Sequence, residues 1–411
     1  MPALRDFDCV VVGAGLAGAA LAIGLAQAGF RVAALDGRAR ASAAPGRDVR
    51  GLALSASSRR VLEALGVWAG LVPKLTPIRE VQVSALGHFG STTLRAASLD
   101  LDALGHVCPA DHLLAQLDAV MDRTHGLEVA YETRLHAVHH EEPAGIRLEL
   151  ANAEGLHGLS ARLLVAADGS QSFVRRHFGI VGQTRDYDQV AIVANVDLER
   201  AAPGTAYERF TNAGPTALLP LDGDKRYVLV RTARTHDAEA LAAMVDAEFL
   251  ADAQRRIGWR MGRLGNLGER RTHALRLDRA ERLTAPRTVL VGNAANTIHP
   301  NAAQGLNLAL RDVATLLDVL AAPGQMGADP GAPTLLENYA ARRRSDHDRT
   351  AGFSDGLARL FGLDGALPTL ARGVALLACD LIPPVRQALM ARLMGLHGTS
   401  NAWLRRAHER R

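Results

Sequence analysis

The chain has 411 residues, 48% of them hydrophobic and 22% charged, which is enough for two closely packed domains. Its 47 basic and 43 acidic residues leave a formal net charge of +4, so the overall charge excludes a protein that coats nucleic acid or another polyanion. Cys9, Cys108 and Cys379 are isolated, without CxxC or CxxH spacing, which argues against a disulfide framework and against a metal site. We therefore expect a cytoplasmic protein without a nucleic-acid partner or a bound metal.

The N-terminal region has the pattern of a βαβ unit. Residues 8–12 are an apolar run typical of a buried strand, residues 16–28 are rich in helix-forming residues, and residues 31–35 form a second apolar run. Further pieces of the same sheet and its covering helices are predicted at 162–167, 288–291 and 304–320. The sequence thus predicts a nucleotide-binding fold assembled from separated segments.

A glycine-rich turn joins the first strand to the first helix. Gly13, Gly15 and Gly18 form the G-x-G-x-x-G pattern, in which glycine allows a tight turn, a close approach to a pyrophosphate and close helix–strand packing. Asp36 ends the second strand, where a carboxylate binds the hydroxyls of an adenosine ribose. Arg38 follows two residues later and joins these residues in the predicted cofactor site.

A different pattern fills the middle of the chain. Partial alternation of apolar and polar residues predicts strands at 80–85, 189–196, 216–219 and 226–231. Such alternation suits a mainly antiparallel sheet with one covered face. A helical C-terminal region follows, with a break at Pro383-Pro384.

Two further motifs stand at strand ends. One is Asp168-Gly169, and the other contains Gly292-Asn293, His299-Pro300 and Gly305-Leu306-Asn307. With the glycine turn, these motifs resemble those of the group A flavoprotein monooxygenases, related to aromatic hydroxylases such as 4-hydroxybenzoate hydroxylase. The resemblance implies a Rossmann-like α/β FAD-binding domain, an interleaved and mainly antiparallel substrate domain, and a helical C-terminal region. The predicted segments are 1–75, 107–183 and 283–340 for FAD, 76–106 and 184–282 for substrate, and 341–411 for the C-terminal region.

The resemblance also assigns roles to residues. It implies that the glycine turn holds the FAD pyrophosphate, that Asp168-Gly169 supports FAD and the reduced nicotinamide, and that the third motif binds the ribityl chain and flavin ring. An amide at Asn293 can bond a ribityl hydroxyl, and backbone N–H groups near Gly305–Asn307 can stabilise negative charge on a reduced flavin. Gly292 and Leu306 complete the predicted cofactor set.

Three residues are predicted on the catalytic side. The resemblance places an arginine such as Arg50 near the isoalloxazine edge or the ribityl phosphate, so Arg50 is predicted both on the catalytic side and in the cofactor set; an ordinary surface arginine is the alternative interpretation. His299 is biased to an extended conformation by Pro300, and together they are expected to shape the substrate side of the flavin.

Within the ubiquinone-biosynthesis hydroxylases, Gly292-Asn293 through His299-Pro300 resembles the 2-polyprenyl-6-methoxyphenol hydroxylase branch. That resemblance implies FAD-dependent hydroxylation of a polyprenylated phenol with O2, through a flavin C4a-hydroperoxide. NAD(P)H would bind transiently, because the sequence has no second G-x-G-x-x-G turn; a protein electron donor is the alternative. The other interpretations are a sister hydroxylase acting at another ring position, a hydroxylase of a soluble aromatic, an isoprenoid reductase or halogenase, and a non-catalytic FAD-binding scaffold.

The C-terminal region interleaves apolar residues with arginines. From 342 to 411 there are 12 arginines against 6 acidic residues, a balance that suits an anionic lipid surface or a partner protein as well as an ordinary packed helix. This pattern predicts peripheral contact with the inner membrane or with other ubiquinone-biosynthesis proteins.

Overall fold

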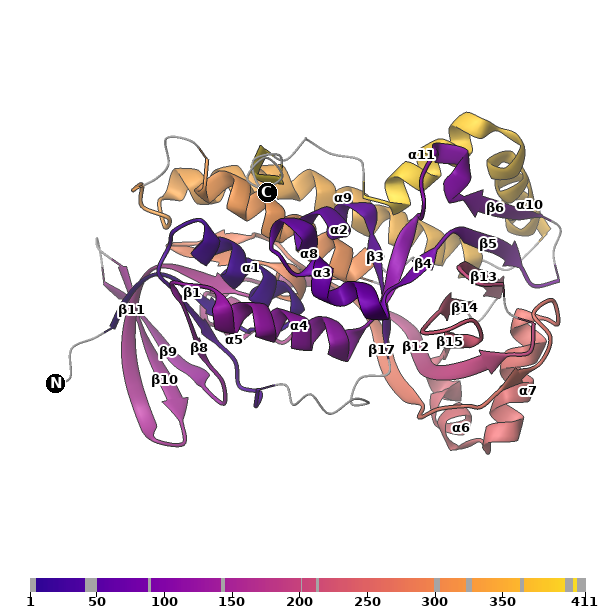
Figure 1. The fold of residues 1–411 in the computed structure, drawn as a ribbon, viewed down its shortest axis with the longest axis horizontal. Helices are drawn as coiled ribbons and strands as arrows, with labels where there is room; N and C mark the ends of the chain where they lie inside the picture. Colours follow the sequence, from indigo (N-terminus) through magenta and orange to yellow (C-terminus); the bar gives the residue numbers. More distant parts are fainter. Residues whose placement is uncertain are drawn as a thin grey trace.

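The computed structural model describes residues 5–40, 50–87, 90–141, 145–200, 202–211, 214–298, 304–322, 327–362, 366–395 and 402–404. Figure 1 shows two large sheets at opposite ends of the molecule, with long helices running above and between them. The predicted α/β architecture is confirmed.

The first sheet contains the βαβ unit. Its eight strands are β1 Arg5–Val12, β2 Val32–Leu35, β8 Leu127–Ala130, β9 Arg134–Glu141, β10 Gly145–Asn152, β11 Gly155–Ala166, β18 Thr284–Ala285 and β19 Thr288–Leu290. β19, β11, β1, β2 and β8 are parallel neighbours in that order. β11 is longer than its predicted run of 162–167, because its first half pairs with β10 in a hairpin that extends beyond the parallel core. The carboxyl ends of three strands from distant segments therefore meet at one edge.

Four helices pack with this sheet: α1 Leu16–Gln27, α4 Ala110–Arg123, α8 Gln304–Leu320 and α9 Pro333–Gly362. α1 packs between α4 and α8, and α9 covers α8. The approach of α1 to α8 is close, because a Cβ at Gly24 would lie 2.4 Å from a methyl carbon of Leu317. This packing fixes the start of α8 beside the glycine turn.

The second sheet has nine strands. They are β5 Glu80–Ala85, β6 Ser91–Arg95, β12 Gly182–Leu198, β13 Thr205–Thr211, β14 Gly214–Pro220, β15 Arg226–Arg234, β16 Leu264–Gly265, β17 Arg271–Ala280 and β20 Asn296–Thr297. Neighbouring strands in this sheet are antiparallel except for β13 and β5, which are parallel. The helices α6 Ala238–Ala243 and α7 Asp246–Ile257 lie against one face (Figure 1).

A small sheet connects the two halves. It consists of β3 Gly51–Ser55, β7 Gly105–Pro109 and β4 Thr76–Ile78, all antiparallel. Because β7 pairs with both β3 and β4, the predicted boundary between residues 106 and 107 falls inside a strand. The boundary between 340 and 341 likewise falls inside α9, and the domain limits remain a prediction.

The C-terminal helices α10 Ala366–Leu381 and α11 Pro383–Leu393 lie beside β5 and β6, far from the first sheet (Figure 1). Pro383 begins α11, as the Pro383-Pro384 break predicts. Buried Met390 and Met394 pack with Leu94 of β6.

Candidate functional site

The glycine turn after β1 has no room for side chains at two positions. Gly13 has φ +95°, and a Cβ there would lie 2.4 Å from the carbonyl oxygen of Ala167. A Cβ at Gly18 would lie 1.8 Å from the carbonyl oxygen of Gly13. Both positions therefore require glycine, and the close approach to Ala167 brings the turn against the segment that leads into Asp168-Gly169.

Gly15 has the opposite environment. A Cβ there would meet nothing within 4 Å, and Gly15 is the N-cap of α1, whose first turn has no side-chain cap and no acidic residue. The first N–H groups of a helix lack partners within the helix and attract anions. The turn is therefore an open cradle suited to a pyrophosphate.

Asp36 and Arg38 lie beside this cradle. Asp36 accepts hydrogen bonds from the backbone N–H of Ala14 at 2.8 Å and of Arg38 at 2.9 Å. The Arg38 guanidinium makes two bonds to Asp118, at 2.7 and 3.1 Å, and one to the Ala14 carbonyl at 3.0 Å. Arg38 thus braces the turn through protein contacts, and its predicted role toward the cofactor remains a prediction.

Asp168 stands where β11 ends beside β1. One of its carboxylate oxygens accepts bonds from the N–H groups of Phe173 and Val174, at 2.7 and 3.2 Å. The other oxygen is buried without a hydrogen-bond partner among the described residues. Arg175, in the helix that follows, forms a two-point ion pair with Asp278 of β17 at 2.8 and 3.0 Å. This motif therefore joins the two large sheets.

The third motif begins at Gly292, after β19. Gly292 has φ +63°, and a Cβ there would lie 3.2 Å from Ala17 of α1, so this turn also packs against the glycine-turn helix. Asn293 is exposed, as a ligand-binding amide would be. Both amide atoms of Asn296 are buried without a partner among the described residues.

Asn307, in the first turn of α8, binds the small connecting sheet. Its side-chain oxygen accepts bonds from the Ser55 N–H at 2.9 Å and the Ser58 hydroxyl at 2.6 Å, and its NH2 donates to Ala53 at 2.9 Å. A Cβ at Gly305 would meet nothing within 4 Å. The Asn307 side chain thus positions this turn, while the backbone near Gly305 is open to a ligand.

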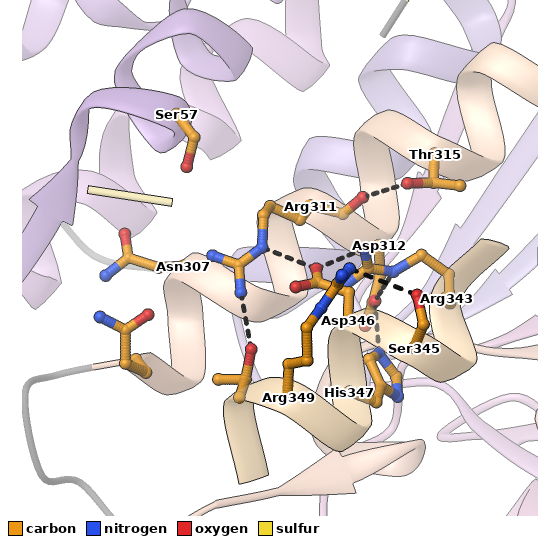
Figure 2. Close-up of polar contacts among 12 residues, drawn as sticks. Ser57, Asn307, Arg311, Asp312, Thr315, Arg343, Ser345, Asp346, His347 and Arg349 are labelled. Atoms are coloured by element: carbon orange, nitrogen blue, oxygen red, sulfur yellow. Dashed lines mark hydrogen bonds and ion pairs between the residues drawn. The ribbon is translucent and has the colours of Figure 1, made fainter. Parts of the chain in front are cut away.

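A buried carboxylate farther along α8 also anchors this region, and Figure 2 shows the polar side chains around it. Asp312 of α8 accepts bonds from the Gly292 N–H at 3.1 Å, from Arg343 at 2.6 Å and from His347 at 2.7 Å. Although burial alone would raise the pKa of Asp312, the facing charges of His347 and Arg343 lower it to about 2. Asp346 extends the network by binding Arg343 and Arg311, at 2.6 and 2.8 Å. The ionised Asp312 therefore holds the Gly292 turn in place.

These features fit a flavin dinucleotide. The uncapped start of α1 beside Gly15 suits a pyrophosphate, and the open turn at Gly305 suits a flat ring approached by backbone N–H groups. The unpartnered amide of Asn296 supplies polar atoms that a bound group can satisfy.

Comparisons with known proteins agree with this fit. Residues 6–354 match the family described as FAD binding domain. The chain is 36% identical to the ubiquinone hydroxylase UbiL of Rhodospirillum rubrum, over 94% of this chain and 89% of that one. It is 31% identical to the 3-demethoxyubiquinol 3-hydroxylase of Escherichia coli K12, over 83% and 86% of the two chains. The chain belongs to the ubiquinone-hydroxylase family of FAD-dependent aromatic monooxygenases.

The fold agrees with this assignment. The p-nitrophenol 4-monooxygenase PnpA of Pseudomonas putida DLL-E4 superposes with a TM-score of 0.81 over 97% of this chain and 100% of that one, at 16% identity. The predicted family, the FAD cofactor and the 4-hydroxybenzoate hydroxylase-like architecture are thereby confirmed.

The structure brings together some, but not all, of the predicted site residues of this monooxygenase. It gathers the three glycine-containing motifs at one edge of the first sheet. Arg50 is exposed just before β3, where its carbonyl accepts a bond from the Ala110 N–H at 3.0 Å, and its predicted role near the flavin remains untested. His299 and Pro300 lie outside the described residues.

Sequence reasoning missed the Asp312 network. The available signal was the placement of acidic residues within an otherwise apolar helix, since Asp312 and Asp318 are both buried in α8. Buried carboxylates are normally paired, and the cluster of arginines at 342–344 supplied the partners.

Proposed function

We propose that this monooxygenase hydroxylates the ring of a polyprenylated phenol in ubiquinone biosynthesis, converting 2-polyprenyl-6-methoxyphenol to the hydroquinone with O2 and NAD(P)H. The observation that carries the proposal is the apolar inner face of the second sheet, opposite α6 and α7. Ala206, Val193 and Val228 on this face form one cluster with Val107 and Ile78 of the connecting sheet. These residues are buried in the cluster, and the partly buried Val81, Leu219 and Val230 beside it continue an apolar surface that suits an aromatic ring with a hydrocarbon tail.

The protein's part in the reaction is to bind and orient. FAD, when bound, supplies the activation of O2 and the oxygen-transfer chemistry. The N–H groups after Gly15 would hold the pyrophosphate, and the backbone near Gly305 would orient the flavin ring. The apolar inner face would exclude water from the reacting ring. NAD(P)H would bind transiently, since the sequence contains a single G-x-G-x-x-G turn.

A second ring position is the main alternative, because one relative is named a 3-demethoxyubiquinol 3-hydroxylase. The test is quinone profiling by mass spectrometry in a bacterial strain that lacks its own 6-methoxyphenol hydroxylase and expresses this chain. We expect accumulated 2-polyprenyl-6-methoxyphenol to disappear and ubiquinone to return. Persistence of that intermediate, with FAD bound to the expressed protein, would reject this ring position and leave a sister hydroxylase or a hydroxylase of a soluble aromatic. Absence of flavin bleaching by NADPH and by NADH, with no substrate turnover, would favour a scaffold.

We also propose that the corner between α10 and α11 touches the inner membrane. In the described part of the chain no single helix is long and apolar enough to span a membrane, although residues 373–381 and 383–393 together pass that test with a 100° bend. At this bend Leu381, Ile382 and Val385 are 67%, 47% and 41% exposed. Such a corner suits shallow insertion of apolar side chains.

Vesicle flotation tests this contact. Replacing Leu381, Ile382 and Val385 by serine should lower the fraction of protein that floats with anionic phospholipid vesicles several-fold. Leu156→Ser, at a 63% exposed leucine in the β10–β11 hairpin, is the matched control and should not change flotation. Equal flotation of the triple variant and the wild type would reject the contact.

A further inference from the structure

Glu208 lies in the middle of β13, in the interior of the nine-stranded sheet. Its neighbours Tyr207 and Arg209 point to the outer face: Tyr207 packs in the cluster that contains Phe249 of α7, and Arg209 donates to the Ile257 carbonyl at 3.0 Å. Because successive side chains of a strand alternate between faces, Glu208 belongs to the inner face.

The inner face turns toward the cofactor-binding half. Ala206, two residues before Glu208, packs against Val107 of the connecting sheet. In the same sheet, the Ala53 carbonyl accepts a hydrogen bond from Asn307 at the start of α8. The face that carries Glu208 therefore packs against the connecting sheet. That sheet in turn binds the first turn of α8, which belongs to the third motif.

The side chains directly beside Glu208 on this face are aliphatic, and beyond Val83 the row reaches Thr92 of β6, whose hydroxyl donates to Asp380 of α10 at 3.5 Å. The direct cross-strand neighbours of Glu208 are Ala217 on β14 and Val83 on β5. The same row continues through Val230 and Val193. No hydrogen bond or ion pair reaches the Glu208 carboxyl from any described residue, and the side chain is only partly exposed.

An ionised carboxyl on such a surface is costly. Burial against apolar neighbours raises the pKa of Glu208 from 4.5 to about 7. Carboxyls with a raised pKa in a ligand-binding region are candidates for acid–base work. Among the described residues, no hydrogen bond or ion pair uses this carboxyl.

We propose that Glu208 is the hydrogen-bond acceptor and base for the phenolic hydroxyl of the substrate. This assignment rests on the proposed function. When the proton transfers, the phenol O–H bond breaks, an O–H bond forms at a Glu208 carboxylate oxygen, and the electron pair remains on the phenol oxygen. No atom changes oxidation state. The resulting phenolate releases electron density into the ring and activates it toward oxygen transfer.

Anchoring the hydroxyl would also contribute to regiospecificity. A ring held at its oxygen by β13 has a limited set of carbons that it can present toward the cofactor-binding half. Glu208 is therefore both the base and a determinant of the ring position that is hydroxylated.

Binding measurements on the FAD-loaded protein test the assignment without turnover. The probes are 2-allyl-6-methoxyphenol and its methyl ether, which lacks the hydroxyl. The variants are Glu208→Gln, which keeps an acceptor oxygen but no base, and Glu208→Leu, which keeps neither. Glu80→Gln, at a carboxylate of β5 paired with exposed Arg95, is the matched control.

We expect wild type and Glu80→Gln to bind the phenol about tenfold more tightly than the ether. Glu208→Gln should retain part of this preference, and Glu208→Leu should lose it. Because neither variant has a base at this position, both should lower kcat/KM for hydroxylation by roughly 10²-fold.

A preference for the phenol and a kcat/KM that both survive in Glu208→Leu would overturn the assignment while leaving the proposed function intact. If the wild type with FAD neither distinguishes the phenol from the ether nor hydroxylates it, the proposed function and this assignment both fail. A lower melting temperature in Glu208→Leu does not obscure these outcomes, because the isosteric Glu208→Gln is measured beside it.

Discussion

The two halves of the molecule each contain a carboxyl group in apolar surroundings, but the two groups differ in their partners and their pKa values shift in opposite directions. Asp312, between α8 and α9, is buried with three hydrogen-bond donors, and the facing charges of His347 and Arg343 lower its pKa to about 2. Glu208, on the inner face of the second sheet, has no partner among the described residues, and burial raises its pKa to about 7. In the cofactor half the carboxylate of Asp312 fixes a backbone turn, whereas in the substrate half no described residue pairs with the carboxyl of Glu208.

Removal of the negative charge at Asp312 should produce the largest effect. Asp312→Asn removes one of the two carboxylates that pair with buried Arg343, the other being Asp346, and weakens the bond to Gly292. We therefore expect a loss of about 3 kcal/mol in the free energy of unfolding. Urea denaturation of the holoprotein measures it. Asp122→Asn, which breaks the exposed ion pair with Arg40, should cost about 0–1 kcal/mol. Equal losses in the two variants would remove the contrast on which this account rests.

The pH dependence of stability tests the other side of the comparison. Since the folded-state pKa of Glu208 is raised from 4.5 to about 7, its ionisation costs stability as the pH rises through this window. Glu208→Gln removes that cost, so the variant should match the wild type near pH 4.5 and exceed it above pH 7 by about 1–2 kcal/mol, allowing for partial exposure. Denaturant titrations across this window provide the measurement. A stability difference that does not change with pH would contradict an unpartnered carboxyl.

A glycine substitution in the cofactor half should have a smaller effect, on FAD binding and not on stability. A Cβ at Gly15 would meet no protein atom within 4 Å, and the helix start there is open. Gly15→Ala should leave the stability of the apoprotein unchanged and weaken FAD binding about tenfold, because the methyl group enters the pyrophosphate cradle. Fluorescence titration of the apoprotein with FAD measures the affinity. Gly352→Ala, at an equally open position in α9, should bind FAD like the wild type; equal affinities of the Gly15 and Gly352 variants would place the pyrophosphate elsewhere.

The cofactor half was predictable because backbone geometry limits its residues. At Gly13 and Gly18 a Cβ would collide with carbonyl oxygens, so glycine spacing carries positional information. The positive φ of Gly292 likewise favours glycine at that turn. Asp36 could be predicted from its position directly after a strand. The strands, the FAD cofactor and the family could therefore be predicted from the sequence.

The substrate half was not predictable to the same depth. Glu208 occupies one position of an alternating strand. Ala217 flanks it in the hairpin formed with the next strand, but the sequence does not show that Val83 flanks it on the other side, because that pairing joins segments far apart in the chain. The register of three separate strands determines its environment. The bonds that Asn307 makes to Ser55 and Ser58 join segments even farther apart in the chain, and the sequence does not show them either.

The most direct test of the central claim is in vitro hydroxylation with isotopically heavy O2. Purified protein loaded with FAD is incubated with 2-polyprenyl-6-methoxyphenol and NADPH or NADH, and the product is examined by mass spectrometry. The account predicts a hydroquinone that contains one heavy oxygen atom on the ring, with the yield strongly reduced in Glu208→Leu. Oxidation of the reduced nicotinamide without heavy oxygen in any ring product would contradict it.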